Sequence, residues 1–255
     1  MKKFVAAVLL FALSAAHAFS QTEEPALRIV FMGDSITDGG WGNSGGSAMP
    51  SAERNQTDIN HIYGHSFMFL CASQLESDYP QLEYHMWNRG ISGDDISRIA
   101  SRWQEDVMEL KPELLSFLEG ANDVHYFLER DDSSDFDFER WEKAYRDLVE
   151  QTLSDNPSIV IFLCTPFTAP SGWVGRSRNY PQREETIDEM AGRIRQMAVD
   201  YKATLVDFNS LFKELCSQPE GPSHWSWDGI HPTPAGHRRM ADLWLKTYIK
   251  TFNLK

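Results

Sequence analysis

The feature that most constrains the fold of this chain is a repeated alternation of short apolar runs with longer amphipathic runs. In the longer runs apolar residues recur every three or four positions, as in Ile96, Ile99, Trp103 and Val107, which is the period of a helix buried on one side. The short runs have the length and composition of buried strands. The predicted strands are 27–32, 82–87, 114–118, 158–164 and 203–208. The predicted helices are 66–77, 94–110, 138–153, 184–201 and 234–252.

This alternation predicts one three-layer α/β/α domain. Strands separated by helices form βαβ units, which produce a parallel sheet covered by helices on both faces. No internal repeat or low-complexity linker divides the chain, so we expect a single domain over residues 19–255. Two segments, 38–64 and 165–183, are long for simple connections and follow the first and fourth strands. Long loops of compact domains are often functional, although both segments are also compatible with ordered, inert loops.

The first 18 residues have the pattern of a secretory signal peptide. Two lysines precede an apolar run at 4–16, and Ala16-His17-Ala18 supplies the small residues of a cleavage site. The run has about 13 residues, fewer than the roughly 20 that span a bilayer. We therefore expect cleavage after Ala18 or up to two residues later, export to the periplasm or medium, and no membrane anchor.

Charge and cysteine content narrow the choice of partners. The formal net charge is −13, and it becomes −15 when Lys2 and Lys3 are removed with the signal. Nucleic acid needs a basic surface, so we expect no nucleic-acid partner. The three cysteines do not suggest a disulfide framework, and Cys71 and Cys164 lie in apolar runs typical of buried positions. We expect neither a metal nor another cofactor, and no feature specifies an oligomeric state.

Polar residues gather where strands end. Residues 33–37 follow the first strand, 88–94 the second, 120–123 the third, and 228–232 precede the last helix. The carboxyl ends of parallel strands lie on one edge of the sheet, which is where such folds bind ligands. The four segments are Gly33-Asp34-Ser35-Ile36-Thr37, Asn88-Arg89-Gly90-Ile91-Ser92-Gly93-Asp94, Gly120-Ala121-Asn122-Asp123 and Asp228-Gly229-Ile230-His231-Pro232.

These segments supply the parts of an acyl-transfer site. The Ser35 hydroxyl is a weak nucleophile until a base such as His231 takes its proton, and Asp228 is close enough in sequence to hold the other ring nitrogen. The backbone N–H groups of Ser35 and Gly93 and the side-chain amide of Asn122 are suitable donors for an oxyanion. Each such donor is typically worth about 3 kcal/mol.

In their order and content the four segments resemble the conserved blocks of the SGNH, or GDSL, hydrolase family, and of bacterial carbohydrate acetylesterases within it. The resemblance spans residues 33–232. It implies a flavodoxin-like sheet with strand order 2-1-3-4-5. It also implies Ser35 as nucleophile, Asp228 and His231 as its partners, and Ser35, Gly93 and Asn122 as the oxyanion hole.

The sequence supports a role in the site less strongly for several other residues. Trp41, Trp173 and Trp227 fall in segments that we place at the active edge, where they either pack the loops or stack on sugar rings. Asp34 is a candidate substrate contact, although ordering the Ser35 turn is the stronger interpretation. Ser44 lies in a match to G-x-S-x-G, but no predicted strand comes directly before it, as that motif requires. Ser210 lies in a match to S-x-x-K, but the S-D-N and K-T-G motifs that accompany S-x-x-K are absent.

The sequence thus predicts an exported serine esterase that hydrolyses small acyl esters, most simply acetyl groups, on a small-molecule or polysaccharide substrate. Two alternatives remain. A lysophospholipase or thioesterase of the same family would prefer long acyl chains, and a non-catalytic carbohydrate-binding relative would bind sugar without ester turnover.

Overall fold

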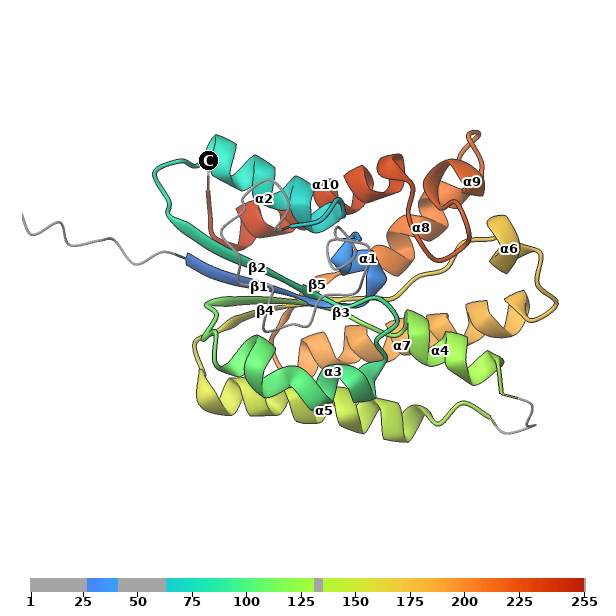
Figure 1. The fold of residues 1–255 in the computed structure, drawn as a ribbon, viewed down its shortest axis with the longest axis horizontal. Coiled ribbons are helices and arrows are strands. Elements are labelled where there is room, and N and C mark those ends of the chain that lie inside the picture. The colour runs from blue at the N-terminus through green and yellow to red at the C-terminus, as the bar shows by residue number, and fades with distance from the viewer. Residues whose placement is uncertain (1–26, 41–62, 131–134, 255) are drawn as a thin grey trace, which may run out of the picture.

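Five parallel strands form the centre of the fold (Figure 1). The computed structural model describes residues 27–40, 63–130 and 135–254. The strands lie in the order β2-β1-β3-β4-β5, which confirms the order that the family resemblance implies. They are β1 (Leu27–Gly33), β2 (Tyr84–Gly90), β3 (Leu114–Leu118), β4 (Val160–Cys164) and β5 (Thr204–Val206).

Helices cover both faces of this sheet, as the strand composition predicts (Figure 1). Every residue of β3 is buried, because a strand in the middle of a parallel sheet has no face left for water. One face is covered by α2 (Phe67–Asp78), α8 (Phe208–Cys216) and α10 (Pro234–Thr251). The other is covered by α3 (Ile96–Trp103), α5 (Phe138–Asp155) and α7 (Tyr180–Asp200). The predicted three-layer α/β/α class is confirmed.

Aromatic side chains fill the space between the sheet and each helical layer. On one side Trp244 of α10 packs against Phe31 and Phe162, with ring centroids 4.9 and 5.3 Å apart. Its indole N–H donates to Ser116 Oγ at 2.9 Å, so this buried polar pair is satisfied. Cys71 and Cys164 are buried free thiols, as predicted from their apolar surroundings.

Several element boundaries differ from the sequence prediction for local reasons. The helix predicted at 94–110 begins at Ile96, because Asp95 is its N-cap, and it continues into a π-helix, η3 (Gln104–Met108). The strand predicted at 203–208 ends at Val206, because the Asp207 side chain accepts a hydrogen bond from Ser210 N and starts α8. The prediction lacked α4 (Ala121–Leu128) and α8, since both are short: α4 begins inside the segment 120–123, and α8 begins at the last residue of the predicted strand 203–208.

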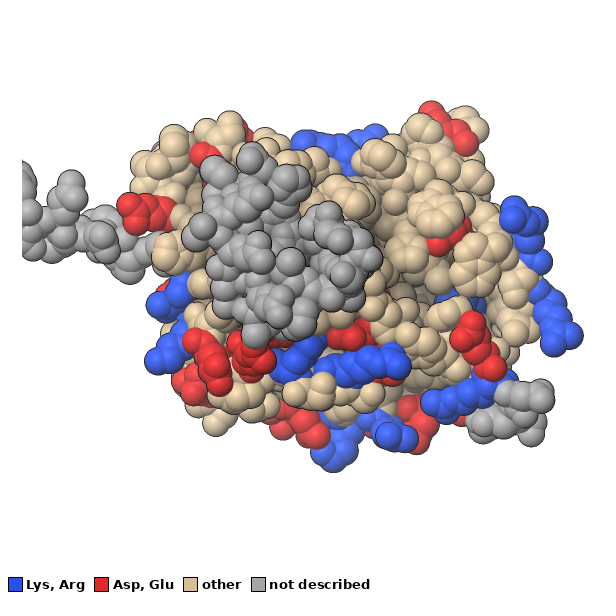
Figure 2. Space-filling model, viewed as in Figure 1, with Lys and Arg blue, Asp and Glu red and all other residues tan. Residues whose placement is uncertain are grey.

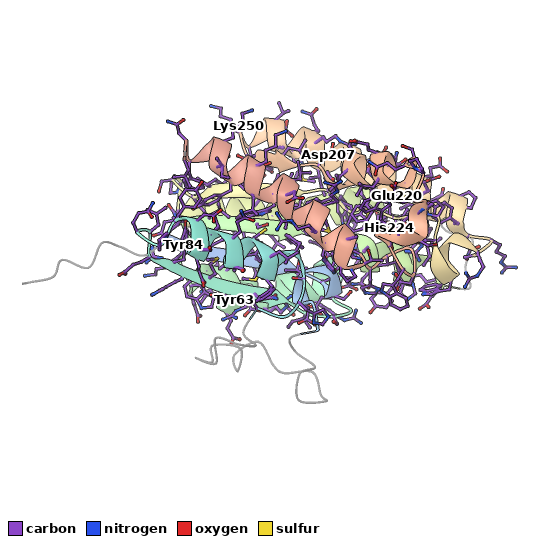
Figure 3. All side chains as sticks on the ribbon, turned by 90° about the horizontal axis from the view of Figure 1, so that it is seen from above. Tyr63, Tyr84, Asp207, Glu220, His224 and Lys250 are labelled. Atoms are coloured by element: carbon purple, nitrogen blue, oxygen red, sulfur yellow. The ribbon has the colours of Figure 1, made fainter. Side chains whose placement is uncertain are left out.

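The register of the sheet aligns the carboxyl ends of its strands. Gly33 pairs with Gly90 on one side and with Leu118 on the other, and Leu118 in turn pairs with Cys164. The segments that follow these strands therefore emerge on a single edge. Figure 3 shows the two ends of the molecule. Tyr84, at the start of β2, lies near one end, and His224 of α9 (Pro222–Trp225) lies toward the other.

The predicted signal peptide, residues 1–18, and most of the predicted loop at 38–64 lie outside the described residues. Within the described ranges, no helix combines the length and the apolar character needed to cross a membrane.

Candidate active site

Ser35 is the first residue of a short helix, α1 (Ser35–Asp38), that starts directly after β1. Asp34 is its N-cap, with Oδ1 accepting a hydrogen bond from Ile36 N at 2.8 Å. Asp34 is only 1% exposed, and burial raises the pKa of its carboxyl to about 6. This geometry favours the interpretation that Asp34 orders the Ser35 turn over direct contact with substrate.

A tight turn brings Asp228 and His231 together. Gly229 adopts φ +101°, a backbone conformation that favours glycine, and its N–H donates to Ser226 Oγ. Asp228 Oδ1 accepts from the backbone N–H groups of Ile230 and His231, at 2.9 and 2.7 Å. Its other oxygen, Oδ2, lies 2.7 Å from His231 Nδ1. The carboxylate is thereby fixed against the ring nitrogen that must carry a proton when the other nitrogen acts as a base.

Ser35 completes this arrangement from the other end of the sequence. Its Oγ lies 2.8 Å from His231 Nε2, although the two residues are 196 positions apart. The hydrogen bond to Asp228 raises the pKa of His231 above its ordinary value, against the effect of burial. Burial by itself would raise the pKa of Asp228, but hydrogen bonds from His231 and the turn outweigh it and lower that pKa. A hydroxyl, an imidazole and an ionised carboxylate in this order can activate a serine nucleophile.

A segment that the sequence analysis treated as loop supports Asp228 from behind. The segment 165–183 contains α6 (Gly172–Gly175) and the first turn of α7. Val174 N donates to Asp228 O at 3.1 Å, and Gly172, at φ +54°, packs directly on the Asp228 backbone. A Cβ at position 172 would lie 2.3 Å from Asp228 Cα. No periodicity in the sequence signals this contact.

The predicted oxyanion donors come from the segments after β1, β2 and β3: Ser35 begins α1, Gly93 lies in a turn, and Asn122 lies in the first turn of α4. Gly93 has φ +86°, and its carbonyl accepts from Tyr126 Oη at 2.7 Å and Arg98 Nη1 at 2.9 Å. Asn122 Nδ2 donates to Asp94 O at 2.8 Å, with Asp34 Oδ2 farther away at 3.4 Å. Within the described part of the chain, the backbone N–H groups of Ser35 and Gly93 donate to no other group. Both are thus available to an oxygen that develops negative charge.

Two of the three predicted tryptophans flank this site. Trp227, adjacent to Asp228, is 61% exposed, and its ring stacks on His231 with centroids 6.1 Å apart. Trp173 is 48% exposed and meets the ring of His125 edge-on at 5.9 Å. Trp41 lies outside the described residues. Both rings therefore leave apolar surface exposed beside the site.

Comparison with known proteins identifies the family. The sequence model of the GDSL-like lipase/acylhydrolase family matches residues 31–239, which include all four polar segments that the sequence analysis singled out. This chain belongs to that family. It is 30% identical to an acetylxylan esterase from Geobacillus stearothermophilus over 222 residues, covering 86% of this chain and 92% of the esterase.

Solved structures agree with this assignment. A GDSL-like lipase from Parabacteroides merdae superimposes with a TM-score of 0.74 at 28% identity, covering 87% of this chain and 94% of that one. An acetylxylan esterase from Geobacillus stearothermophilus superimposes with a TM-score of 0.69 at 28% identity, covering 87% and 93%. This GDSL family member is a carboxylic-ester hydrolase.

Buried carboxyl groups lie close to the GDSL site. Burial raises the pKa of Glu119 well above its ordinary value, and burial also raises the pKa values of Asp123 and Asp34. Burial disfavours the charged form of a carboxyl group, so it weakens the negative charge of this cluster beside the site. Among the described residues, no three His, Cys, Asp or Glu side chains are arranged to hold a metal ion.

Charged side chains are unevenly distributed on the surface of this hydrolase. Figure 2 shows Lys, Arg, Asp and Glu concentrated on the side of α3 and α5, with basic side chains also at the edge beside α6. Arg176 and Arg178 are exposed, whereas Arg183 of α7 is buried and lies 3.4 Å from His125 Nδ1. The three arginines of the second long segment therefore do not form one surface patch.

Sequence reasoning missed the side chains that hold the Gly93 loop. Arg102 of α3 and Tyr126 of α4 both contact it, and neither belongs to a strand-end segment. The spacing of Arg102 and Asp106 on a predicted helix was a usable signal, because oppositely charged residues four apart share a helix face.

Proposed function

We propose that the protein is an exported serine esterase that removes acetyl or similarly small acyl groups from carbohydrates. The observation that carries the proposal is the continuous hydrogen-bonded path from Ser35 Oγ through His231 to Asp228, with distances of 2.8 and 2.7 Å. The likeness to an acetylxylan esterase supports the acyl group and the class of substrate. The signal-like N-terminus supports export, since a polysaccharide substrate lies outside the cell.

The proposed reaction proceeds in two steps. His231 Nε2 takes the Ser35 proton as Oγ attacks the ester carbonyl, while Asp228 holds the Nδ1 proton and stabilises the imidazolium. The carbonyl oxygen becomes an oxyanion that accepts from the Ser35 and Gly93 N–H groups and from Asn122 Nδ2. Collapse of the intermediate expels the sugar alkoxide, which takes the proton from His231. Water then attacks the acyl-serine by the same route, releasing acetate and restoring Ser35.

Exposed aromatic rings support the carbohydrate assignment. Trp227 extends from the turn that carries Asp228 and His231, and Trp173 extends from the helix that packs on Asp228. The apolar face of a sugar ring stacks on such side chains, while its hydroxyl groups remain in water. Solved forms of the Geobacillus stearothermophilus esterase include catalytic mutants in which a serine, an aspartate or a histidine is replaced by alanine. These residue types match the proposed triad.

The test is turnover by purified mature protein and its Ser35→Ala variant. The wild-type enzyme should release acetate from acetylated xylooligosaccharides and from an aryl acetate, and Ser35→Ala should lose nearly all of both activities. Undiminished turnover by Ser35→Ala would exclude Ser35 as the nucleophile. A chain-length series of esters separates the alternatives, because a preference for long acyl chains indicates a lipase-like or thioesterase-like member. Oligosaccharide binding without any ester turnover would indicate a non-catalytic relative.

A further inference from the structure

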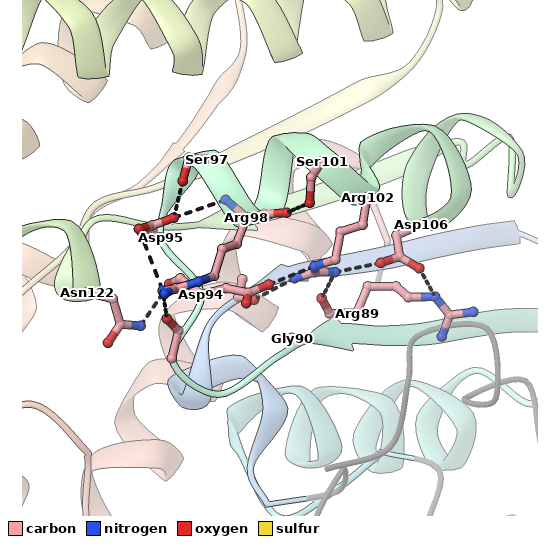
Figure 4. A network of polar contacts seen from close by, with 12 residues as sticks. Arg89, Gly90, Asp94, Asp95, Ser97, Arg98, Ser101, Arg102, Asp106 and Asn122 are labelled. Atoms are coloured by element: carbon pink, nitrogen blue, oxygen red, sulfur yellow. Dashed lines mark hydrogen bonds and ion pairs between the residues drawn. The ribbon is translucent and has the colours of Figure 1, made fainter. Parts of the chain in front are cut away.

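Arg102 of α3 connects the ends of β1 and β2 with the loop that carries Gly93 (Figure 4). Its Nε donates to Asp94 Oδ2 at 2.8 Å and its Nη1 donates to Arg89 O at 2.8 Å. Its Nη2 approaches Gly33 O at 3.3 Å. A guanidinium directs its N–H groups outward in a rigid plane, so one side chain fixes two backbone carbonyl groups and the Asp94 carboxylate relative to one another.

The charge of this side chain is balanced within the same cluster. Arg102 Nη1 lies 2.6 Å from Asp106 Oδ2, and Asp106 Oδ1 lies 3.2 Å from Arg89 Nε. The Arg102 side chain is 11% exposed, and the side chains of Asp94 and Asp106 are 9% and 1% exposed. Ion pairs this deeply buried add little stability compared with apolar packing. The cluster therefore matters more for the positions of the backbone segments that it connects than for the stability of the fold.

Each of the proposed oxyanion donors is close to one of the acceptors of Arg102. Ser35 follows Gly33 by two residues, and Gly93 immediately precedes Asp94. Asn122 is connected through Asp94 O, which accepts from Asn122 Nδ2 at 2.8 Å (Figure 4). The three donors come from three different strand ends, and Arg102 is bonded to two of those ends and to the residue that orients the third donor.

We propose that Arg102 is a positioning residue that sets the spacing of the oxyanion-hole donors. The inference rests on the proposed serine-esterase function. Arg102 acts through the backbone at Gly33 and through Asp94. Donors to an oxyanion must be placed to within a fraction of an ångström, and a displacement of about 1 Å can cost about 100-fold in rate.

The alternative is that Arg102 simply anchors α3 to the sheet. An anchor would affect stability, or the whole site without distinction, whereas a positioning residue would affect turnover through the oxyanion hole in particular. A double-mutant cycle with Asn122 separates the two roles. If Arg102 acts through the oxyanion hole, the losses of activity caused by the two substitutions are not additive.

The experiment compares Arg102→Met, Arg102→Lys, Asn122→Ala and Arg102→Met/Asn122→Ala on an aryl acetate, each checked for folding by thermal unfolding. Arg146→Met is the matched control, since Arg146 of α5 also bonds two carboxylates, on Glu142 and Asp200, but lies outside the site. Arg102→Met should lower kcat by about tenfold or more with KM changed by less than about threefold. The control should keep kcat within about twofold.

The cycle gives the decisive result. Asn122→Ala should lower kcat by about 100-fold. The double variant should lie within about threefold of Asn122→Ala, because the geometry that Arg102 maintains has lost its main donor. Arg102→Lys keeps the charge and does not reproduce the planar fork, so it should fold and still show reduced kcat. Wild-type kcat in Arg102→Lys, or full additivity in the cycle, would overturn the inference. If Ser35→Ala remained active, the failure would instead lie with the proposed function.

Discussion

The contact between Gly172 and Asp228 allows a sharp test of how the site is supported. Gly172 lies in α6 at φ +54°, where an alanine is disfavoured by about 1–2 kcal/mol. A Cβ there would lie 2.3 Å from Asp228 Cα and 2.5 Å from Trp227 O, both of which are backbone atoms that cannot rotate away. Reaching an ordinary contact of about 3.4 Å requires a shift of roughly 1 Å between α6 and the Asp228 turn.

That shift has a cost that can be worked out from the surrounding bonds. The two segments are held together by hydrogen bonds from Val174 N to Asp228 O at 3.1 Å and from Ala169 N to Gly229 O at 3.0 Å. Weakening one of them adds about 1 kcal/mol, so Gly172→Ala should destabilise the protein by about 2–3 kcal/mol in urea unfolding. Because the displaced residue is Asp228, kcat on an aryl acetate should fall by up to about 100-fold with little change in KM.

Gly192→Ala is the matched control for this prediction. Gly192 lies inside α7, where an added Cβ meets no atom within 4 Å. Alanine is favoured over glycine in a helix interior, so this variant should gain about 0.5–1 kcal/mol and keep wild-type kcat. The reasoning is refuted if folded Gly172→Ala turns over at the wild-type rate, or if Gly192→Ala loses stability and activity to the same extent.

Three further predictions follow from the same structure. Asp228→Asn should lower kcat by about 100-fold or more and move the acid limb of the kcat/KM profile to lower pH, because the carboxylate that raises the pKa of His231 is removed; an unchanged acid limb would contradict this. His237 accepts a hydrogen bond from Phe67 N, and burial together with nearby histidines lowers its pKa from 6.5 to about 4. Its contribution to stability is complete above about pH 6.5 and falls by about 3 kcal/mol as pH drops through 4, so His237→Asn, which keeps an acceptor, should flatten the pH dependence seen in urea unfolding. Trp227→Ala should raise KM for acetylated xylooligosaccharides by roughly tenfold and change aryl-acetate turnover by less than about threefold, and equal losses on both substrates would argue against sugar stacking at Trp227.

Much of the fold was predictable because its signals are local. The apolar runs that become β1, β3 and β4 have no polar face, and the helices between them show a clear period, so layers and strand direction followed from the sequence. The strand order did not follow from periodicity and came from the family resemblance. The predicted element boundaries were wrong where a single capping side chain decides them, as Asp207 does between β5 and α8.

The sequence by itself determined which side chains are available at the carboxyl edge of the sheet. Ser35, Gly93, Asn122, Asp228 and His231 were all identifiable, since each sits in a short polar segment at the end of an apolar run or just before the last helix. Only the tertiary structure decided how they meet. The bond between Ser35 and His231 joins residues 196 positions apart, and the supports at Gly172 and Arg102 depend on packing between distant elements. Periodicity indicates which face of an element is buried, but it carries no information on which partner covers that face. These contacts are therefore defined only by the tertiary structure.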